Sequence, residues 1–277
     1  MFVTYRKRPA SLILRVLIIL SAVITIGVLF SLIMYILING ISHLTPELFA
    51  WEFSTDNMSM MPAIISTLYM IVLSLLIAVP AGVFCAVYLV EYAKRGSKLV
   101  KIIRSATETL QGIPSIVYGL FGYILFVITL GWSYSLIAGA VTLAIMILPL
   151  IIRTSEESLA AVPDSYREGS FGLGAGKLHT VFKLILPSAV PGILAGIILA
   201  LGRIVGESAA LIFTAGTVAQ APESLFDSAR TLSVHMYALL SEGLYTNEAY
   251  ATAVVLLILV VIINGLSSMI AKKISMR

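Results

Sequence analysis

Charged residues are scarce in this chain of 277 residues: Asp, Glu, Lys and Arg make up 12% of it, while 59% of the residues are hydrophobic. Soluble domains carry roughly 25% charged residues, so the composition excludes an ordinary soluble domain and indicates lipid as the solvent. The single cysteine, Cys85, excludes an internal disulfide and a cluster of cysteine metal ligands. The three histidines are scattered, and none belongs to a His-Glu-x-x-His motif. We therefore expect no metal, no cofactor and no catalytic residue in this chain.

The chain contains no polar linker, internal repeat or low-complexity tract, so we expect a single membrane domain over residues 1–277. A helix that crosses a bilayer needs about 20 predominantly apolar residues. Six segments meet this requirement: Leu12–Ile38, Pro62–Val90, Ser105–Leu130, Ser133–Ile152, Ser188–Ala215 and Ala249–Ala271. The first is much longer than the apolar core of a cleaved secretion signal, which has about 7–15 residues, so we expect it to be retained. The predicted fold class is an all-α integral membrane protein with six transmembrane helices.

Lysine and arginine are distributed unevenly between the connections of these helices. Sixteen of the 18 lie at the start of the chain, in the connections from the second to the third and from the fourth to the fifth helix, or at its end. The alternate connections contain only Arg230, and Arg203 lies within the fifth helix. Positively charged connections are held on the cytoplasmic side of a membrane. This predicts that both termini are cytoplasmic and that residues 40–61 and 216–248 lie outside.

The cytoplasmic connection over residues 154–187 carries the most informative local pattern. Ser165 and Glu168 have the spacing of a capping box, which predicts a short helix from there to about Leu173. Three glycines follow, and glycine readily takes the positive φ that closes a helix. A second, amphipathic helix is expected to end at Pro187. These features alone fit equally a loop on the bilayer surface or a helix that docks into another protein.

The same connection resembles a motif of a known family. Glu168-Gly169-Ser170 is followed by three residues and Gly174, and after nine more residues by Leu184-Ile185-Leu186-Pro187. This spacing is similar to the Glu-Ala-Ala motif of permeases of ATP-driven (ABC-type) importers, with Gly and Ser for the two alanines and Leu for an Ile. In that family a helix of this connection couples the permease to its ATPase. The resemblance implies a type I ABC importer permease fold with a coupling segment at 154–187 and these ATPase-coupling residues: Arg167, Glu168, Gly169, Ser170 and Gly174.

A loose likeness to a phosphate-binding loop occurs in Gly172-Leu-Gly-Ala-Gly176-Lys177. A Walker motif has four residues between its glycines and a Ser or Thr after its lysine. This segment has three, and Leu178 follows the lysine. We therefore expect that ATP is hydrolysed by a separate subunit and that this chain is not an enzyme.

The fifth expected helix contains two charged residues, Arg203 and Glu207, in apolar surroundings. A spacing of four puts both side chains on one helical face, where they can pair. Either charge alone near the bilayer centre costs about 2.5–3.5 kcal/mol on insertion scales. The two residues are then either a structural ion pair or an anion-binding arginine held by the glutamate, because a guanidinium presents a planar fork suited to phosphate or carboxylate oxygens. Two pairs of glycines in the same helix predict close contacts with neighbouring helices: Gly192 with Gly196, and Gly202 with Gly206.

Early in the third expected helix, Gly112 and Pro114 interrupt the backbone hydrogen bonds, and Ser115 follows them. Such a break is tolerated where neighbouring helices or cavity water satisfy the freed groups. The break is either a plain kink or part of the lining of a substrate path. Arg153, at the cytoplasmic end of the fourth helix, is in the same way either an interfacial anchor or a transport residue.

Two segments that contain these residues, LQGIPSIVYGLFG and GRIVGESAALIFTAG, resemble the permeases of the bacterial phosphate-specific transport system. The likeness covers essentially the whole chain, and the long last external connection favours the PstA type of permease. It implies a phosphate path in the cell (inner) membrane, shared with a PstC-like permease subunit, two copies of a cytoplasmic ATPase subunit and an extracytoplasmic phosphate-binding protein. The substrate-pathway residues that it implies are Arg203, Glu207, Gly112, Pro114, Ser115 and Arg153.

Two alternatives stay open. A sister permease for sulfate or molybdate shares the coupling motif, although the two segments above favour phosphate. A gated channel without an ATPase leaves the coupling motif unexplained.

Overall fold

The computed structural model describes residues 9–94 and 96–275, and within them every regular element is a helix. The long helices are α1 (Pro9–Ile41), α2 (Met61–Val87), α5 (Leu136–Ala160), α8 (Leu186–Val205) and α11 (Thr246–Ser275). The shorter α-helices are α3 (Lys98–Gln111), α4 (Ser115–Gly122), α6 (Asp164–Gly172), α7 (Lys177–Thr180), α9 (Ala209–Thr214) and α10 (Leu232–Glu242). A 3₁₀ turn covers Pro46–Phe49, and π-helical turns cover Tyr88–Tyr92, Tyr123–Thr129 and Val181–Ile185.

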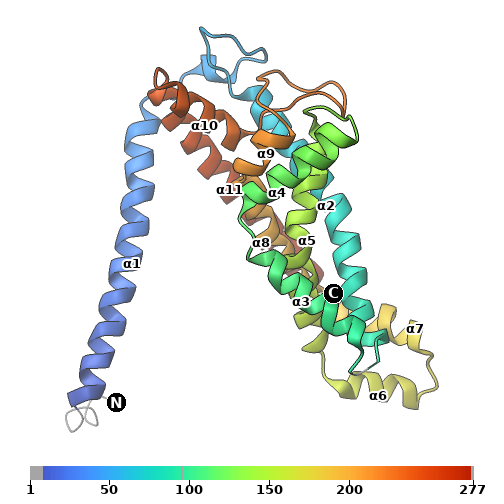
Figure 1. Cartoon of the computed structure of the whole chain (residues 1–277). Helices are drawn as coiled ribbons and strands as arrows, with labels where there is room; N and C mark the ends of the chain where they lie inside the picture. Colours follow the sequence, from blue (N-terminus) through green and yellow to red (C-terminus); the bar gives the residue numbers. More distant parts are fainter. Residues whose placement is uncertain (1–8, 95, 276–277) are drawn as a thin grey trace.

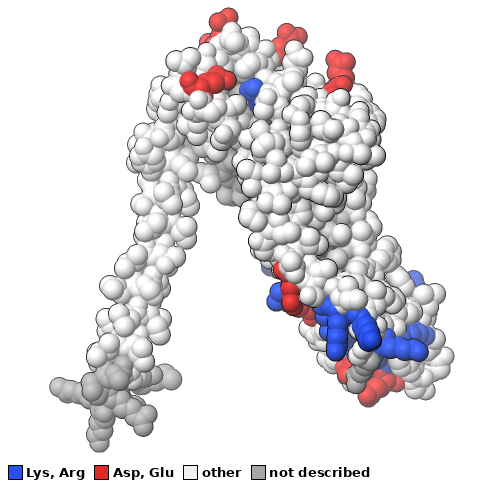
Figure 2. Space-filling model, in the orientation of Figure 1, with Lys and Arg blue, Asp and Glu red and all other residues white. Residues whose placement is uncertain are grey.

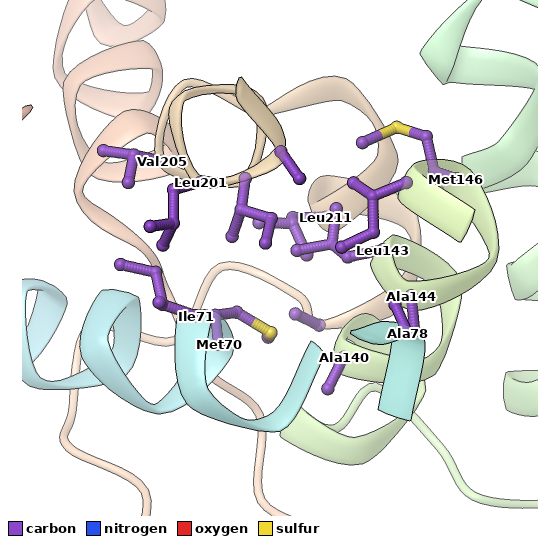
Figure 3. Packing of buried hydrophobic residues seen from close by; sticks show 14 of the residues in the cluster. Met70, Ile71, Ala78, Ala140, Leu143, Ala144, Met146, Leu201, Val205 and Leu211 are labelled. Atoms are coloured by element: carbon purple, nitrogen blue, oxygen red, sulfur yellow. The ribbon is translucent and has the colours of Figure 1, made fainter. Parts of the chain in front are cut away.

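Five helical segments are long and apolar enough to cross a membrane, and a sixth is obtained when α3 and α4 are counted as one broken span. This confirms the expected all-α fold. The central helix is α5, which begins where the Ser135 hydroxyl accepts the N–H of Ala138 at 3.3 Å. It packs against α2 and α8, and apolar side chains of these helices and of α9 fill the space between them (Figure 3). The large buried side chains of this core include Met70, Leu143, Met146, Leu201 and Leu211.

The first helix, α1, stands apart from the others along most of its length (Figure 1). Every side chain from Leu12 to Tyr35 is exposed. Near its C-terminal end α1 packs against α11, where Gly40 lies against the backbone of Tyr250 and the hydroxyls of Tyr35 and Tyr250 are 3.2 Å apart. An apolar helix that is left uncovered by its own chain is covered by lipid or by another subunit.

The third span is two helices, so the expectation of one helix over Ser105–Leu130 is wrong. The axes of α3 and α4 differ in direction by 105°. Pro114 has no N–H to donate, and it disfavours helical backbone at Ile113 before it, which ends α3. The break is therefore a sharp corner in the chain, more than a kink.

The fifth span also differs from its expected bounds. Helical structure continues from Lys177 to Val205, so Pro187 does not end the amphipathic helix. Just before it, in a π-helical turn, the N–H of Leu186 donates to the carbonyl of Val181. Such a turn shifts the hydrogen-bond register of a helix, and here it precedes the residue that has no N–H.

The two ends of the molecule differ in charge (Figure 2). On the face shown, Lys and Arg side chains gather at the lower end, where Figure 1 places α3 and α6, while acidic side chains lie at both ends and predominate only at the upper end. The separation agrees with a cytoplasmic lower end. The orientation in the membrane itself stays a prediction.

Candidate functional site

Arg203 lies near the end of α8 and has no charged partner among the described residues. Its side chain is half-buried, and no hydrogen bond or ion pair joins it to any residue in the described part of the chain. The expected pair with Glu207 is wrong. α8 ends at Val205 and does not continue to Ala215, so a spacing of four no longer brings the two side chains to one helical face.

Glu207 instead fixes the junction between three helices. Its side-chain oxygen Oε1 accepts the N–H of Ala210 at 3.0 Å, at the start of α9. A carboxylate is favourable there because the first N–H groups of a helix lack partners and carry partial positive charge. The Glu207 carbonyl accepts the hydroxyl of Ser233 in α10 at 2.5 Å. With 8% of its surface exposed, Glu207 holds the connection from α8 to α9 against α10.

The residues of the break in the third span lie as expected at the corner. Gly112 follows the last residue of α3, and Pro114 precedes Ser115, the first residue of α4. Gly112 and Pro114 are exposed, and Ser115 is half-buried. The side-chain amide of Gln111 donates to the carbonyl of Pro149 in α5 at 3.1 Å, which holds the corner against the central helix.

Two residues of α4 that were not among the predicted site residues, Tyr118 and Gly119, connect the corner to α8 and α9. The hydroxyl of Tyr118 donates to the carbonyl of Leu110 at 2.8 Å and so ties α4 back to the end of α3. A Cβ atom added to Gly119 would lie 2.8 Å from Cα of Ala210 in α9. Arg203 is near enough to Tyr118 to act on its phenol electrostatically. The structure therefore brings together the corner, the unpaired arginine and the capping glutamate.

Arg153 lies far from α9 and close to the corner. The N–H of Ser135, just before α5, donates to the carbonyl of Thr214 at the end of α9. Arg153 follows 18 residues later on the same helix, about 27 Å along its axis. There its Nε donates to Oε1 of Glu157 at 3.0 Å, with both side chains more than half exposed. Pro149, whose carbonyl accepts from Gln111 beside the corner, is only four residues from Arg153, about 6 Å along α5. The pathway role of Arg153 stays a prediction.

The two glycine pairs of the fifth span behave differently. An added Cβ atom at Gly192 or Gly196 would overlap with Ser158 or Thr154 of α5, so the predicted close contact is confirmed for this pair. Around Gly202, by contrast, no atom of the described chain lies within 4 Å of an added Cβ. The second pair therefore leaves an uncovered face of α8 beside the unpaired arginine.

The short helix predicted in the coupling segment is confirmed as α6. The capping box is not formed, because Pro163 occupies the N-cap position and no side chain caps the helix. The expectation that glycine closes the helix is right for Gly174, whose φ is +84°. The N–H groups of Gly174 and Ala175 donate to the carbonyls of Phe171 and Ser170 at 2.9 and 3.1 Å, which is a usual way for a helix to end.

The five predicted coupling residues divide into two groups. Glu168, Gly169 and Gly174 are exposed, with open space around both glycines. Ser170 is half-buried, with its hydroxyl 2.8 Å from a hydroxyl of α7. Arg167 is turned inward and pairs within the chain at 2.7 Å. The surface offered to another protein thus contains the first group only.

Large apolar side chains are exposed on the same segment. Leu173 is 90% exposed and Leu178 is 68% exposed, and Tyr166 and Phe171 are each exposed by 47%. α6 and Leu173 lie outside the membrane spans, whereas Leu178 lies within the span Lys177–Val205. Neighbouring apolar side chains that are left exposed outside a span indicate contact with another protein.

Comparisons with known proteins agree with this arrangement. The family model described as "Binding-protein-dependent transport system inner membrane component" matches residues 78–276. The chain is 36% identical to the probable ABC transporter permease protein YqgI of Bacillus subtilis (strain 168), over 92% of this chain and 94% of that protein. It is 34% identical to the phosphate transport system permease protein PstA of Mycobacterium leprae (strain TN), over 73% of this chain and 67% of that protein.

Two solved structures share the fold. A chain of the MetNI methionine ABC transporter, in an inward-facing conformation, superposes with a TM-score of 0.60 at 22% identity, covering 87% of this chain and 97% of that one. A chain of a bacterial alginate ABC transporter superposes with a TM-score of 0.73 at 14% identity, covering 98% of both. The fold is thus that of type I ABC importer permeases. The matched residues, the relatives and the apolar spans all identify the chain as a multi-pass ABC transporter permease subunit and not an enzyme. The chain belongs to the family of binding-protein-dependent transport system inner membrane components.

Proposed function

We propose that the chain is a membrane-spanning permease subunit of an ATP-driven phosphate importer. The observation that carries the proposal is Arg203, a permanently charged group near the end of a span with no carboxylate beside it in the described residues. A charge within a span costs up to about 2.5–3.5 kcal/mol, the value at the membrane centre. The cost is offset when the arginine binds an anion, and the planar guanidinium matches phosphate oxygens. The PstA relative supports phosphate as that anion.

Glu207 and the corner of the third span support the arginine without neutralising it. The Glu207 carboxylate is engaged by the N–H of Ala210, so it holds the end of α8 in place and leaves the donors of Arg203 for the substrate. Gly112, Pro114 and Ser115 line the same path, because irregular backbone at membrane depth occurs where it lines a cavity or is covered by protein. Arg153, in an exposed pair, fits the interfacial anchor better than the anion site.

A second permease subunit of the PstC kind completes the path. Two uncovered surfaces support this partner: α1, which is exposed along most of its length, and the face of α8 at Gly202. Small residues allow the backbones of two helices to approach closely within a membrane. A phosphate ion that passes between the two subunits would then meet Arg203 at their contact.

The ATPase binds at α6. The exposed apolar side chains of Tyr166, Phe171 and Leu173 supply the buried part of this contact, and Glu168 and Gly169 lie on the same exposed helix. The complex that we propose has two copies of the ATPase subunit on the cytoplasmic side and a phosphate-binding protein on the other. It lies in the cell (inner) membrane with both termini of this chain in the cytoplasm.

The test is ATP-dependent uptake of radiolabelled phosphate by the complete complex in proteoliposomes that are supplied with the binding protein. We expect uptake that requires ATP and that an excess of sulfate or molybdate does not reduce. Uptake of sulfate or molybdate in preference to phosphate would assign the chain to a sister permease instead. Phosphate flux that is equal with and without ATP would make it a channel.

A further inference from the structure

A buried ion pair joins the coupling segment to the end of α2. Arg167 of α6 donates from Nη2 and Nε to Oε1 of Glu91, at 2.7 and 3.1 Å. Glu91 lies in the π-helical turn that follows α2, and its side chain is only 7% exposed. We propose that Glu91 is a positioning residue that sets the angle of α6 and passes movement of α6 on to α2. This inference rests on the ATPase-coupling role of α6 proposed above.

The other donors of Arg167 hold the end of α5. Nη1 donates to the carbonyl of Val162 at 2.8 Å, and Nη2 donates to the carbonyl of Leu159 at 3.1 Å. The last carbonyls of a helix have no N–H partner further along the helix, so a cation placed there is favourable. One guanidinium therefore joins three segments: the end of α2, the end of α5 and the coupling helix α6.

Of the two carboxylates near Arg167, Glu91 is the one that fixes it. Its hydrogen bond raises the pKa of the Arg167 guanidinium above the ordinary value, an effect that partial burial opposes. Asp164 lies 3.1 Å from Nη1, but its side chain is 77% exposed. Exposed ion pairs are screened by water and contribute little, whereas removing one member of a buried pair leaves an uncompensated charge. Asp164 is thus a matched control for Glu91 on the same arginine.

The two long helices held by Arg167 lead into the membrane core. α2 packs along α5, with Ala78 beside Ala144 (Figure 3). α5 in turn packs against α8, which carries Arg203. Because close-packed interiors deform little, a displacement of α6 is passed through these helices. A flexible loop without the buried pair would absorb the same displacement.

The experiment measures phosphate uptake and ATP hydrolysis together in the reconstituted complete complex. Glu91→Gln keeps the size of the side chain and removes its charge. We expect the complex to assemble with its ATPase bound while uptake per ATP hydrolysed falls at least about tenfold, within the usual range of coupling between sites. Asp164→Asn should keep the wild-type ratio. A purely structural role for Glu91 would lower the amount of complex and leave this ratio unchanged.

A wild-type ratio in assembled Glu91→Gln complex would overturn the inference. Where that variant yields no assembled complex, Glu91→Asp decides, because it keeps the charge on a shorter side chain: a lowered ratio supports the positioning role, and a normal ratio refutes it. The ratio is taken for whichever anion the wild-type complex carries. A failure of the phosphate assignment and a failure of the Glu91 assignment are then separate results.

Discussion

Gly119→Ala perturbs the contact through which α4 positions the start of α9. The added Cβ atom would lie 2.8 Å from Cα of Ala210 and 3.2 Å from its carbonyl oxygen. Both are backbone atoms, so no side-chain rotation relieves the overlap and the two helices must move apart. The N–H of Ala210 is also the group that Glu207 caps at 3.0 Å. The substitution therefore disturbs the connection that follows Arg203 without touching the arginine.

The expected loss of stability follows from three contributions. Overpacking of this size costs about 1–3 kcal/mol, and partial weakening of the Glu207 cap adds up to about 1 kcal/mol. The higher helix propensity of alanine offsets about 0.5–1 kcal/mol of this cost. The middle values of these ranges give a net loss of about 2 kcal/mol. Each kcal/mol lowers the Tm of a chain of this size by roughly 2–4 °C.

The assay is thermal unfolding of the purified complex in detergent, with Gly265→Ala in α11 as the matched control. Gly265 lies within a helix, and no atom of the described chain is within 4 Å of an added Cβ. The control should therefore keep or slightly raise the Tm. Equal Tm values for the two variants would refute the account of the α4–α9 contact.

Three further predictions concern the coupling helix and the external side. Leu173→Glu places a charge at the highly exposed residue that directly follows α6. It should lower ATPase recovery with the purified permease about tenfold or more, because burying a leucine contributes about 1.5–3 kcal/mol. Unchanged recovery would exclude docking at Leu173. Gly169→Ala should stabilise α6 by about 0.5–1 kcal/mol, because alanine favours a helix more than glycine does and no described atom lies within 4 Å of an added Cβ. The measurement is amide hydrogen exchange in α6, which should become slower. Faster exchange would contradict the prediction. The pKa of His235 is lowered from 6.5 to about 4, first by burial and then by the charge of Arg230. Between these two pH values the unfolded chain binds a proton that the folded chain does not. The free energy of unfolding should therefore be highest above about pH 6.5 and fall by up to about 3 kcal/mol as the pH drops towards 4. His235→Gln should flatten this part of the curve of Tm against pH, and an unchanged slope would exclude His235 as its source.

Local features of the sequence were enough to predict most of the helices. Apolar length predicted the spans, and the run of glycines predicted the end of α6 at Gly174, because both signals act within a few residues. The same reasoning placed the corner at Gly112 and Pro114. It underestimated the bend, because the angle of 105° depends on what α3 and α4 pack against and not on the proline alone.

Contacts between distant segments could not be predicted in this way. Glu91 and Arg167 are 76 positions apart, and neither residue indicates its partner by spacing. Arg203 and Glu207 show the opposite case, because a spacing of four implies contact only while the helix continues, and α8 ends between them. For Tyr118, the signal in the sequence was the likeness to phosphate permeases, because the similar segment contains this residue.

The central claim is that Arg203 binds the transported phosphate, and its most direct test is phosphate uptake by Arg203→Gln, normalised to assembled complex. Glutamine keeps hydrogen-bond donors and loses the charge, so we expect uptake to fall to background while the complex remains in the membrane at its normal level. Arg203→Lys keeps the charge without the planar fork and should retain little uptake. Normal uptake by Arg203→Gln at normal complex levels would contradict the account.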